Sequence, residues 1–340
     1  MKARHKLCLC LMILVVAVGI ILPGTAAPEG EESGGKTSDR FRVTVKVNMV
    51  NVPVTVRRRE GGFLKGLPQE AFRIYEDGVL QEISIFAQEG LPTHIAIVLD
   101  ISASVNNAWG TIRYATLKFV EHLHPDDRFS LYTFNTQTRL KMDWGQKTDR
   151  MGQVLSSIYC TGNTKVWDTV WLISREGFEG IEDKKAIIIM SDGMDNRSSK
   201  TYDETLEAAV RSEAAIYIVS ETEALSQMYQ YHKRTTGDPY DYFQPEDFAR
   251  ADLALRNLAD KTGGRVLYPN SFGQLNDVYA EVIEELRNQY TIGYISNSPV
   301  NDGAYRTIEV KVNAPDARVS ARPGYYAPND IGQLGSDRIK

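Results

Sequence analysis

Three side chains with oxygen donors, Asp100, Ser102 and Ser104, follow an unbroken aliphatic stretch at residues 96–99. A short aliphatic run of this kind is typical of a strand that is buried on both faces of a parallel sheet. The polar cluster would then lie at the carboxyl end of that strand, where open α/β sheets bind their ligands. Carboxylate and hydroxyl oxygens suit a hard divalent cation. The sequence therefore predicts a metal site at this strand end.

Two later segments complete a recognisable pattern. Residues 184–190 form a second aliphatic stretch, which ends in Ser191, Asp192 and Gly193, and Thr164 lies in a glycine-containing loop between the two stretches. The order Asp-x-Ser-x-Ser, then Thr, then Asp resembles the von Willebrand factor A domain with its metal-ion-dependent adhesion site. The positions that match this pattern are Asp100, Ser102, Ser104, Thr164 and Asp192.

This resemblance implies a binding role for the ion. Ser102, Ser104 and Thr164 would bind Mg²⁺ or Mn²⁺ directly, and the two aspartates would act through water or directly as the state changes. With few negative charges around it, the ion would accept an Asp or Glu carboxylate from a protein partner. The alternative is that these residues only cap helices and form turns, which Ser, Thr and Asp also favour.

The pattern of apolar residues predicts how the chain is organised. Strand-like and helix-like segments alternate over residues 90–288, as in a doubly wound, Rossmann-like α/β domain. Among them we expect a strand at residues 128–134 and helices at residues 166–178 and 202–212.

Residues 41–88 and 290–328 instead alternate apolar and polar side chains with a period of two, which indicates strands. Among them, residues 81–86 would form the second arm of a hairpin after the turn at residues 77–78, and residues 318–326 would form one strand. We expect the two ends to form a small β-sandwich into which the α/β domain is inserted. Residues 72–78 and 322–328 resemble those of exported bacterial proteins related to von Willebrand factor A.

The amino terminus has the three parts of a secretory signal. A basic start, an apolar core at residues 7–22 and small residues near Ala27 predict a signal peptide at residues 1–27. A linker at residues 28–40 and a tail at residues 329–340 complete the predicted chain. We expect export to the periplasm, cell envelope or exterior, with no transmembrane span once the signal is removed; an uncleaved anchor is the alternative.

Charge and cysteine content narrow the function further. Removal of the signal would lower the formal charge from −5 to −8, because it takes away three basic residues and no acid. An acidic chain argues against nucleic acid as a partner. Removal of the signal would also leave Cys160 as the single cysteine. A single cysteine excludes an intramolecular disulfide and favours a buried reduced thiol.

The sequence offers less support for a catalytic site than for the metal site. The five histidines have no spacing typical of a catalytic or metal pair, and no nucleophile elbow or phosphate-binding loop is present. We therefore expect a binding module and not an enzyme. Two alternatives stay open: a metal-assisted hydrolase that uses Asp100 and Asp192, and an envelope scaffold whose metal is structural.

Other residues near the pattern have more ordinary explanations. Asp168 would complement a helix dipole, and Asp195 would cap or turn the loop after Asp192. Residues 221–247 form a long segment without periodicity that is rich in aromatic side chains. We expect Tyr240, Tyr242 and Phe243 in this segment to contact the partner, with plain disorder as the alternative.

Overall fold

A computed structural model describes residues 49–88, 91–145, 150–191, 193–220, 245–298 and 301–329. All of these belong to one compact unit, Val47–Lys340. The predicted signal peptide and linker, Asp192 and the aromatic residues Tyr240, Tyr242 and Phe243 lie outside the described residues. No helix in the described part of the chain is long and apolar enough to cross a membrane.

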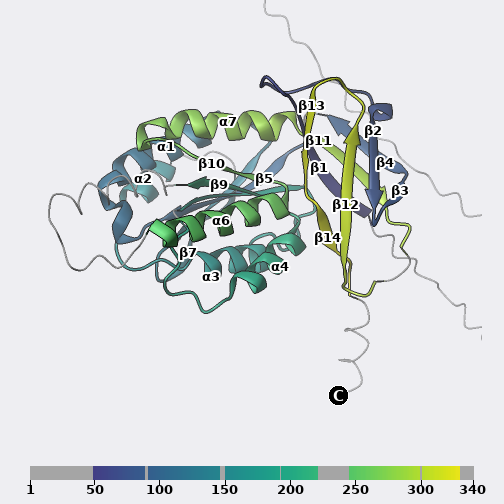
Figure 1. The fold of residues 1–340 in the computed structure, drawn as a ribbon. Coiled ribbons are helices and arrows are strands. Elements are labelled where there is room, and N and C mark those ends of the chain that lie inside the picture. Colours follow the sequence, from purple (N-terminus) through teal and green to yellow (C-terminus); the bar gives the residue numbers. More distant parts are fainter. Residues whose placement is uncertain are drawn as a thin grey trace, which may run out of the picture. The chain divides into compact units, whose positions relative to one another are not determined.

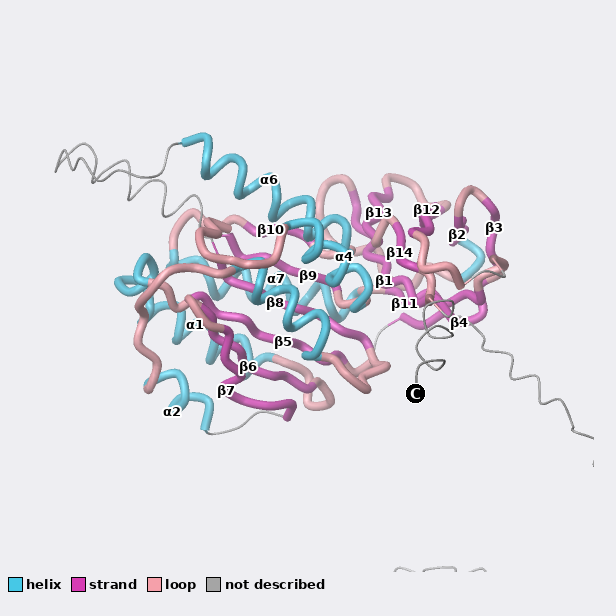
Figure 2. Tube along the Cα trace, turned by 90° about the horizontal axis from the view of Figure 1, so that it is seen from below, coloured by secondary structure: helices cyan, strands magenta, loops and turns pink. Residues whose placement is uncertain are grey.

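The central element is a six-stranded sheet (Figure 1). Its strands, in spatial order, are β10 (Arg265–Leu267), β9 (Ala215–Ser220), β8 (Lys184–Ser191), β5 (Thr93–Asp100), β6 (Arg128–Phe134) and β7 (Thr138–Gly145). Five strands are parallel, and β7 closes the edge as an antiparallel strand. The same strands can be followed side by side in Figure 2.

Helices cover both faces of this sheet. On one face lie α1 (Trp109–His122), α2 (Arg150–Ser156) and α7 (Leu275–Asn288); on the other lie α3 (Val166–Leu172), α4 (Tyr202–Ser212) and α6 (Pro245–Thr262). Ile95, Ile97 and Leu99 of β5 point to the first layer, whereas Ala96 and Val98 point to the second. Burial on both faces explains why this strand is aliphatic throughout.

The described residues also include four short helical segments that are not regular α-helices. They are η1 (Gln69–Ala71), η2 (Ala103–Ala108) and η4 (Phe272–Gln274), which are 3-10 turns, and η3 (Ile173–Gly177), a π turn that continues α3. The single helix predicted over residues 166–178 is thus an α-helix of two turns with a wider last turn.

Both chain ends form two small antiparallel sheets. One has the order β13 (Ala317–Ala321), β1 (Met49–Arg58), β11 (Tyr290–Ile295) and β4 (Ile83–Gln88), and the other β14 (Gly324–Tyr326), β12 (Tyr305–Val312), β2 (Phe72–Glu76) and β3 (Val79–Gln81). Alternate valines of β1 and the rings of Phe72 and Tyr290 fill the core between them. This arrangement confirms the predicted fold class.

Two predicted strands are divided. Residues 81–86 are not one arm of a hairpin, because β3 ends at Gln81 and β4 then begins in the other sheet. Residues 318–326 divide in the same way at Arg322 and Pro323, where proline has no N–H for a sheet. Gly324 starts the next strand, and a Cβ there would clash with the Arg306 carbonyl oxygen.

A buried carboxylate joins the sandwich to α7. Glu285 is 2% exposed, and its Oε2 accepts from Arg57 Nη2 of β1 at 2.5 Å and from Arg265 Nε of β10 at 2.6 Å. Arg57 belongs to the sandwich, whereas Arg265 belongs to the six-stranded sheet. One carboxylate therefore ties three elements together.

Candidate metal centre

Asp100 ends β5 at the point where the order of the strands reverses. The chain passes from β5 to β6 on one side, and β8 pairs with β5 on the other, with Leu99 opposite Met190. Ligands of open α/β sheets bind in the crevice at such a point. The Asp100 side chain is 1% exposed, so its carboxylate is held inside the fold and away from bulk water.

The turn after β5 brings the oxygens of this segment together. Ser102 N donates to Asp100 Oδ1 at 2.7 Å, and Ser102 Oγ lies 2.8 Å from Ser104 Oγ. Adjacent ligands of an octahedral Mg²⁺ are separated by about 2.9 Å when each lies about 2.0–2.1 Å from the ion. The two hydroxyls therefore fit as neighbouring ligands without rearrangement. Ser102 is buried and Ser104 is exposed, so the pair opens to solvent on one side.

The loop that carries Thr164 lies against this turn. Ala103 N donates to Gly162 O at 3.2 Å, and Thr161 N donates to Ile101 O at 2.8 Å. Gly162 has a φ of +86°, a conformation that glycine adopts without strain. Thr164 is 6% exposed. The structure thus places the Thr164 loop beside Ser102, as the pattern of residues requires.

Asp192 lies outside the described residues, but both of its neighbours are described. Ser191 ends β8 and is buried, and its Oγ accepts from Gly193 N at 3.1 Å. Gly193 has a φ of +73°, and a Cβ there would lie 2.7 Å from Leu255 Cδ1. Gly193 therefore packs against α6 in a backbone conformation that glycine adopts without strain. The aromatic residues predicted to contact a partner are also outside the described part of the chain.

The donor set is unusual in its chemistry. Within the described residues, no three His, Cys, Asp or Glu side chains gather closely enough to hold a metal. The described oxygens at the end of β5 are the Asp100 carboxylate and the hydroxyls of Ser102 and Ser104, with Thr164 in the adjoining loop. Such oxygens suit Mg²⁺ or Mn²⁺ better than a metal that prefers sulfur or imidazole.

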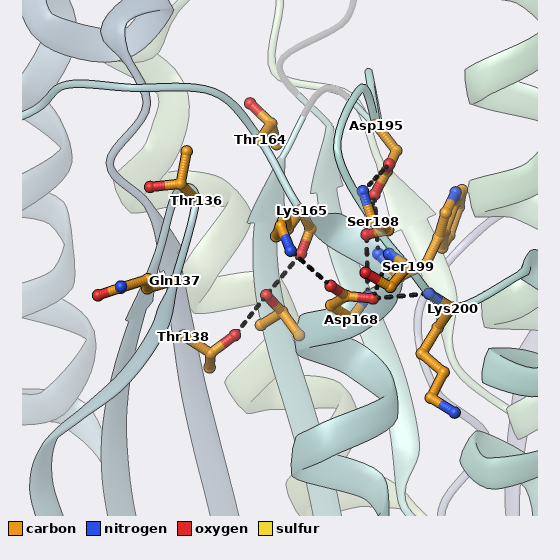
Figure 3. Close-up of polar contacts among 12 residues, drawn as sticks. Thr136, Gln137, Thr138, Thr164, Lys165, Asp168, Asp195, Ser198, Ser199 and Lys200 are labelled. Atoms are coloured by element: carbon orange, nitrogen blue, oxygen red, sulfur yellow. Dashed lines mark hydrogen bonds and ion pairs between the residues drawn. The ribbon is translucent and has the colours of Figure 1, made fainter.

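The first turn of α3 is capped by another loop. Lys165, at the N-cap position, makes no side-chain capping bond. Trp167 N instead donates to Asp195 Oδ2 at 3.1 Å, and Asp168 N donates to Ser198 Oγ at 3.0 Å (Figure 3). Free amides at a helix start need such acceptors. Here the acceptors come from the loop between β8 and α4.

The Asp168 side chain in turn accepts hydrogen bonds from the loop between β8 and α4. Its Oδ1 accepts from Ser199 N and Lys200 N, each at 2.8 Å, and its Oδ2 accepts from Lys165 Nζ at 3.0 Å. Burial by itself would raise the pKa of Asp168, but the hydrogen bonds and the Lys165 charge outweigh it and hold this pKa below its ordinary value. The carboxylate therefore stays ionised and fixes both segments.

Asn196 extends the same contact to Thr164. Asn196 Oδ1 accepts from Thr164 N at 3.2 Å, and Asn196 N donates to Thr164 O at 3.3 Å. Sequence reasoning expected Asp168 and Asp195 to serve a helix or a turn, but it did not single out Asn196 or Ser198. We call Asp168, Asp195, Asn196 and Ser198 the interloop clamp.

Comparisons with known proteins identify the family of this chain. The model of the von Willebrand factor type A domain matches residues 94–281, more than half of the chain. No curated protein matches the chain.

Three solved structures illustrate the similarity at low identity. A von Willebrand factor type A protein from Catenulispora acidiphila is 11% identical over 84% of this chain and 76% of that chain, with a TM-score of 0.44. An aerotolerance-related membrane protein from Bacteroides fragilis is 12% identical over 56% and 98%, with a TM-score of 0.42.

The third is a mussel byssus protein. Proximal thread matrix protein 1, with a zinc-occupied MIDAS motif, is 15% identical over 62% of this chain and 49% of that chain, with a TM-score of 0.44. The family itself rests on the match over residues 94–281. This chain belongs to the von Willebrand factor type A domain family.

Proposed function

We propose that this protein is an exported, metal-dependent binding module that holds a protein partner through a divalent cation. The proposed ligands of Mg²⁺ or Mn²⁺ are Asp100, Ser102, Ser104, Thr164 and Asp192. The observation that supports this most is the pair of hydroxyls of Ser102 and Ser104, 2.8 Å apart beside a buried carboxylate. A pair of this kind has the spacing of two neighbouring ligands on one hard cation.

The chain's own residues would hold the ion and leave one side of it open. Asp100 is engaged by Ser102 N, which fixes the serine turn, and Ser104 faces solvent. When bound, the ion supplies an electrophilic position that accepts an oxygen ligand. An Asp or Glu carboxylate of the partner would fill that position. We infer no catalytic role for these residues.

Selectivity requires contacts beyond the ion, because any exposed carboxylate could reach it. Tyr159 is 83% exposed and lies two residues before Thr161, whose amide binds the turn after β5. Exposed aromatic side chains commonly dominate the binding energy of interfaces. We propose Tyr159 as a partner contact, together with Tyr240, Tyr242 and Phe243 of the predicted loop at residues 221–247.

We further propose the domain limits and the location. The von Willebrand domain would occupy residues 90–288, inserted between the sandwich segments 41–88 and 290–328, and residues 1–27 would direct export. The family match at residues 94–281 supports the limits of the inserted domain. The composition of residues 1–27 supports export to the envelope or beyond it.

The function can be tested with envelope extracts. We expect the immobilised full chain to retain one or more proteins in Mg²⁺, to lose them in EDTA, and to lose them again when Thr164→Ala is used in Mg²⁺. Thr201→Ala, which changes a helix cap at the start of α4, is the matched control and should retain them. Prey that stays bound in EDTA would exclude the metal-bridged mechanism. Turnover that requires Mg²⁺ would favour a hydrolase, and loss of thermal stability alone would favour a scaffold.

A further inference from the structure

A cavity of about 870 Å³ lies at the end of the six-stranded sheet opposite the candidate metal centre. Thr93 and Lys184, the first residues of β5 and β8, line it, whereas Asp100 ends β5 at the other edge. Helices α1 and α7, which run side by side on one face of the sheet, form its walls (Figure 1). A volume of this size is typical of sites for small molecules.

One wall of the cavity is apolar. Ile95, Phe119, Tyr279 and Ile283 line it, and the rings of Phe119 and Tyr279 pack with their centroids 5.1 Å apart. These residues belong to β5, α1 and α7, so the wall is built from rigid elements and not from a loop. Such a wall would shelter a hydrocarbon chain from water.

Lys184 marks the polar end. Its Nζ donates to the carbonyl oxygen of Leu286 at 2.5 Å, and among the described residues no carboxylate forms an ion pair with it. Burial lowers the pKa of Lys184 to about 8, and the more distant carboxylates of Asp127 and Glu285 offset only part of this effect. Asp127 is engaged elsewhere, because its carboxylate accepts from the amides of Thr93 and His124.

Gln289, which also lines the cavity, carries an unsatisfied polar atom. Its side chain is 4% exposed and its Nε2 donates to Tyr217 Oη at 2.9 Å, but within the described residues its Oε1 has no hydrogen-bond partner. A buried amide oxygen without a donor is costly. The polar part of the lining therefore includes an ammonium donor and a separate acceptor, which a water molecule that accompanies a ligand head group would satisfy.

The charge of the lining favours an anion. The charged residues that line the cavity are Lys65, Lys118, Lys184, Arg287, Asp127 and Glu284. Lys118 is paired with Glu121 at 2.7 Å, which leaves three other cations and two anions in the lining, although the whole chain carries a formal charge of −5. We infer that this cavity binds an amphipathic monocarboxylate of the fatty-acid type, with its carboxylate at Lys184 and its hydrocarbon chain along Ile95, Phe119 and Ile283. This site is separate from the proposed metal centre and does not depend on it.

Calorimetry with dodecanoate below its micellar concentration tests this site in the full chain. We expect saturable binding of dodecanoate, and at least tenfold weaker binding of dodecanol, which lacks the charge, and of acetate, which lacks the chain. Lys184→Met should lower the affinity for dodecanoate at least tenfold. This variant should fold, because it replaces a buried ammonium by an apolar side chain of similar length. Ala280→Phe, which fills the cavity from α7, is a second variant and should also abolish binding.

Two controls separate this site from others. Lys311→Met removes an exposed lysine of β12 and should leave dodecanoate affinity unchanged. EDTA and Thr164→Ala should also leave it unchanged, since a carboxylate that binds at the metal centre would be lost in both. Equal binding of dodecanoate by wild type, Lys184→Met and Ala280→Phe would overturn the inference, as would equal binding of dodecanol. Loss of dodecanoate binding in EDTA would also overturn it, because the carboxylate would then bind at the metal.

Discussion

The carboxylate of Asp195 caps a helix in a different part of the chain: its Oδ2 accepts from Trp167 N, in the first turn of α3, at 3.1 Å. The same oxygen accepts from Ser198 Oγ at 2.5 Å, which holds the carboxylate in place. Thr164 lies just before α3, and Asp192 lies three residues before Asp195. This one contact therefore joins the two loops that carry the later members of the proposed ligand set.

The first prediction concerns the interloop clamp. Asp195→Ala should weaken Mg²⁺ binding by roughly tenfold, because residues that orient metal ligands commonly contribute 10- to 100-fold to affinity. Asp195→Asn keeps one acceptor oxygen and should recover part of that loss. Calorimetric titration with Mg²⁺ measures both.

A nearby helix cap supplies the matched control for the clamp. Thr201 caps α4 through Glu204 N, so Thr201→Ala should cost about 1 kcal/mol of unfolding free energy without changing Mg²⁺ affinity. If Asp195→Ala lost stability but bound Mg²⁺ as tightly as wild type, the clamp would have no role in positioning the site.

The second prediction concerns pH. The pKa of Asp168 lies below its ordinary value of 3.8 in the folded protein, because amides of Lys200 and Ser199 and the Lys165 charge outweigh burial. Its contribution to stability is therefore complete above about pH 4 and is lost as the pH falls through the folded pKa. In thermal melts, the melting temperature of Asp168→Asn should lie below that of wild type by a constant amount from pH 7 to pH 5. This difference should narrow below about pH 4. A deficit that did not change with pH would show that the carboxylate charge is not involved.

The third prediction concerns the rim of the site. Tyr159→Ala should weaken the metal-dependent binding of the partner by about 1–2 kcal/mol, since exposed aromatic anchors contribute at this level. It should leave Mg²⁺ affinity unchanged. Tyr114→Ala removes another exposed tyrosine, from α1, and should change neither. Surface plasmon resonance with the retained partner compares the three proteins. Equal partner affinity for wild type and Tyr159→Ala would remove Tyr159 from the contact surface.

The fourth prediction concerns the joint between the sandwich and α7. Glu285→Gln removes the buried carboxylate that Arg57 and Arg265 share. Both arginines keep the more exposed Glu281, so the change should cost roughly 2 kcal/mol of unfolding free energy. Glu309→Gln, which breaks an exposed pair with Lys311, should cost less than about 1 kcal/mol. Urea unfolding measures the difference. Equal midpoints for the two variants would show that the buried carboxylate does not stabilise the joint.

Much of the fold followed from local signals in the sequence. Residues 128–134 and 202–212 were predicted as a strand and a helix, and the structure has β6 and α4 with the same limits. The apolar and aromatic residues of the strand, and the Thr201–Glu204 capping box of the helix, are each formed within a few residues, so no tertiary information is needed to recognise either one. The helix α2 has only seven residues and includes Gly152, and no prediction was made for it.

Features that depend on distant partners could not be predicted. The division of residues 318–326 between two sheets depends on which strands lie beside them, and the clamp joins Trp167 to Asp195, which lies 28 residues further along the chain. For the metal site, the sequence predicted the residue types, and the turn from Asp100 to Ser104 forms within five residues. The contact of Asn196 with Thr164 spans 32 residues and has no local signature.

The central claim is that the oxygens at the end of β5 bind a hard cation, and a Mg²⁺ titration of the full chain by calorimetry tests it most directly. We predict one site in wild type, with affinity reduced at least tenfold in Ser102→Ala and in Thr164→Ala. Ser199→Ala, a serine of the neighbouring loop whose hydroxyl is not a proposed ligand, should bind as wild type does. No heat of binding in wild type, or the same affinity in all four proteins, would contradict the assignment.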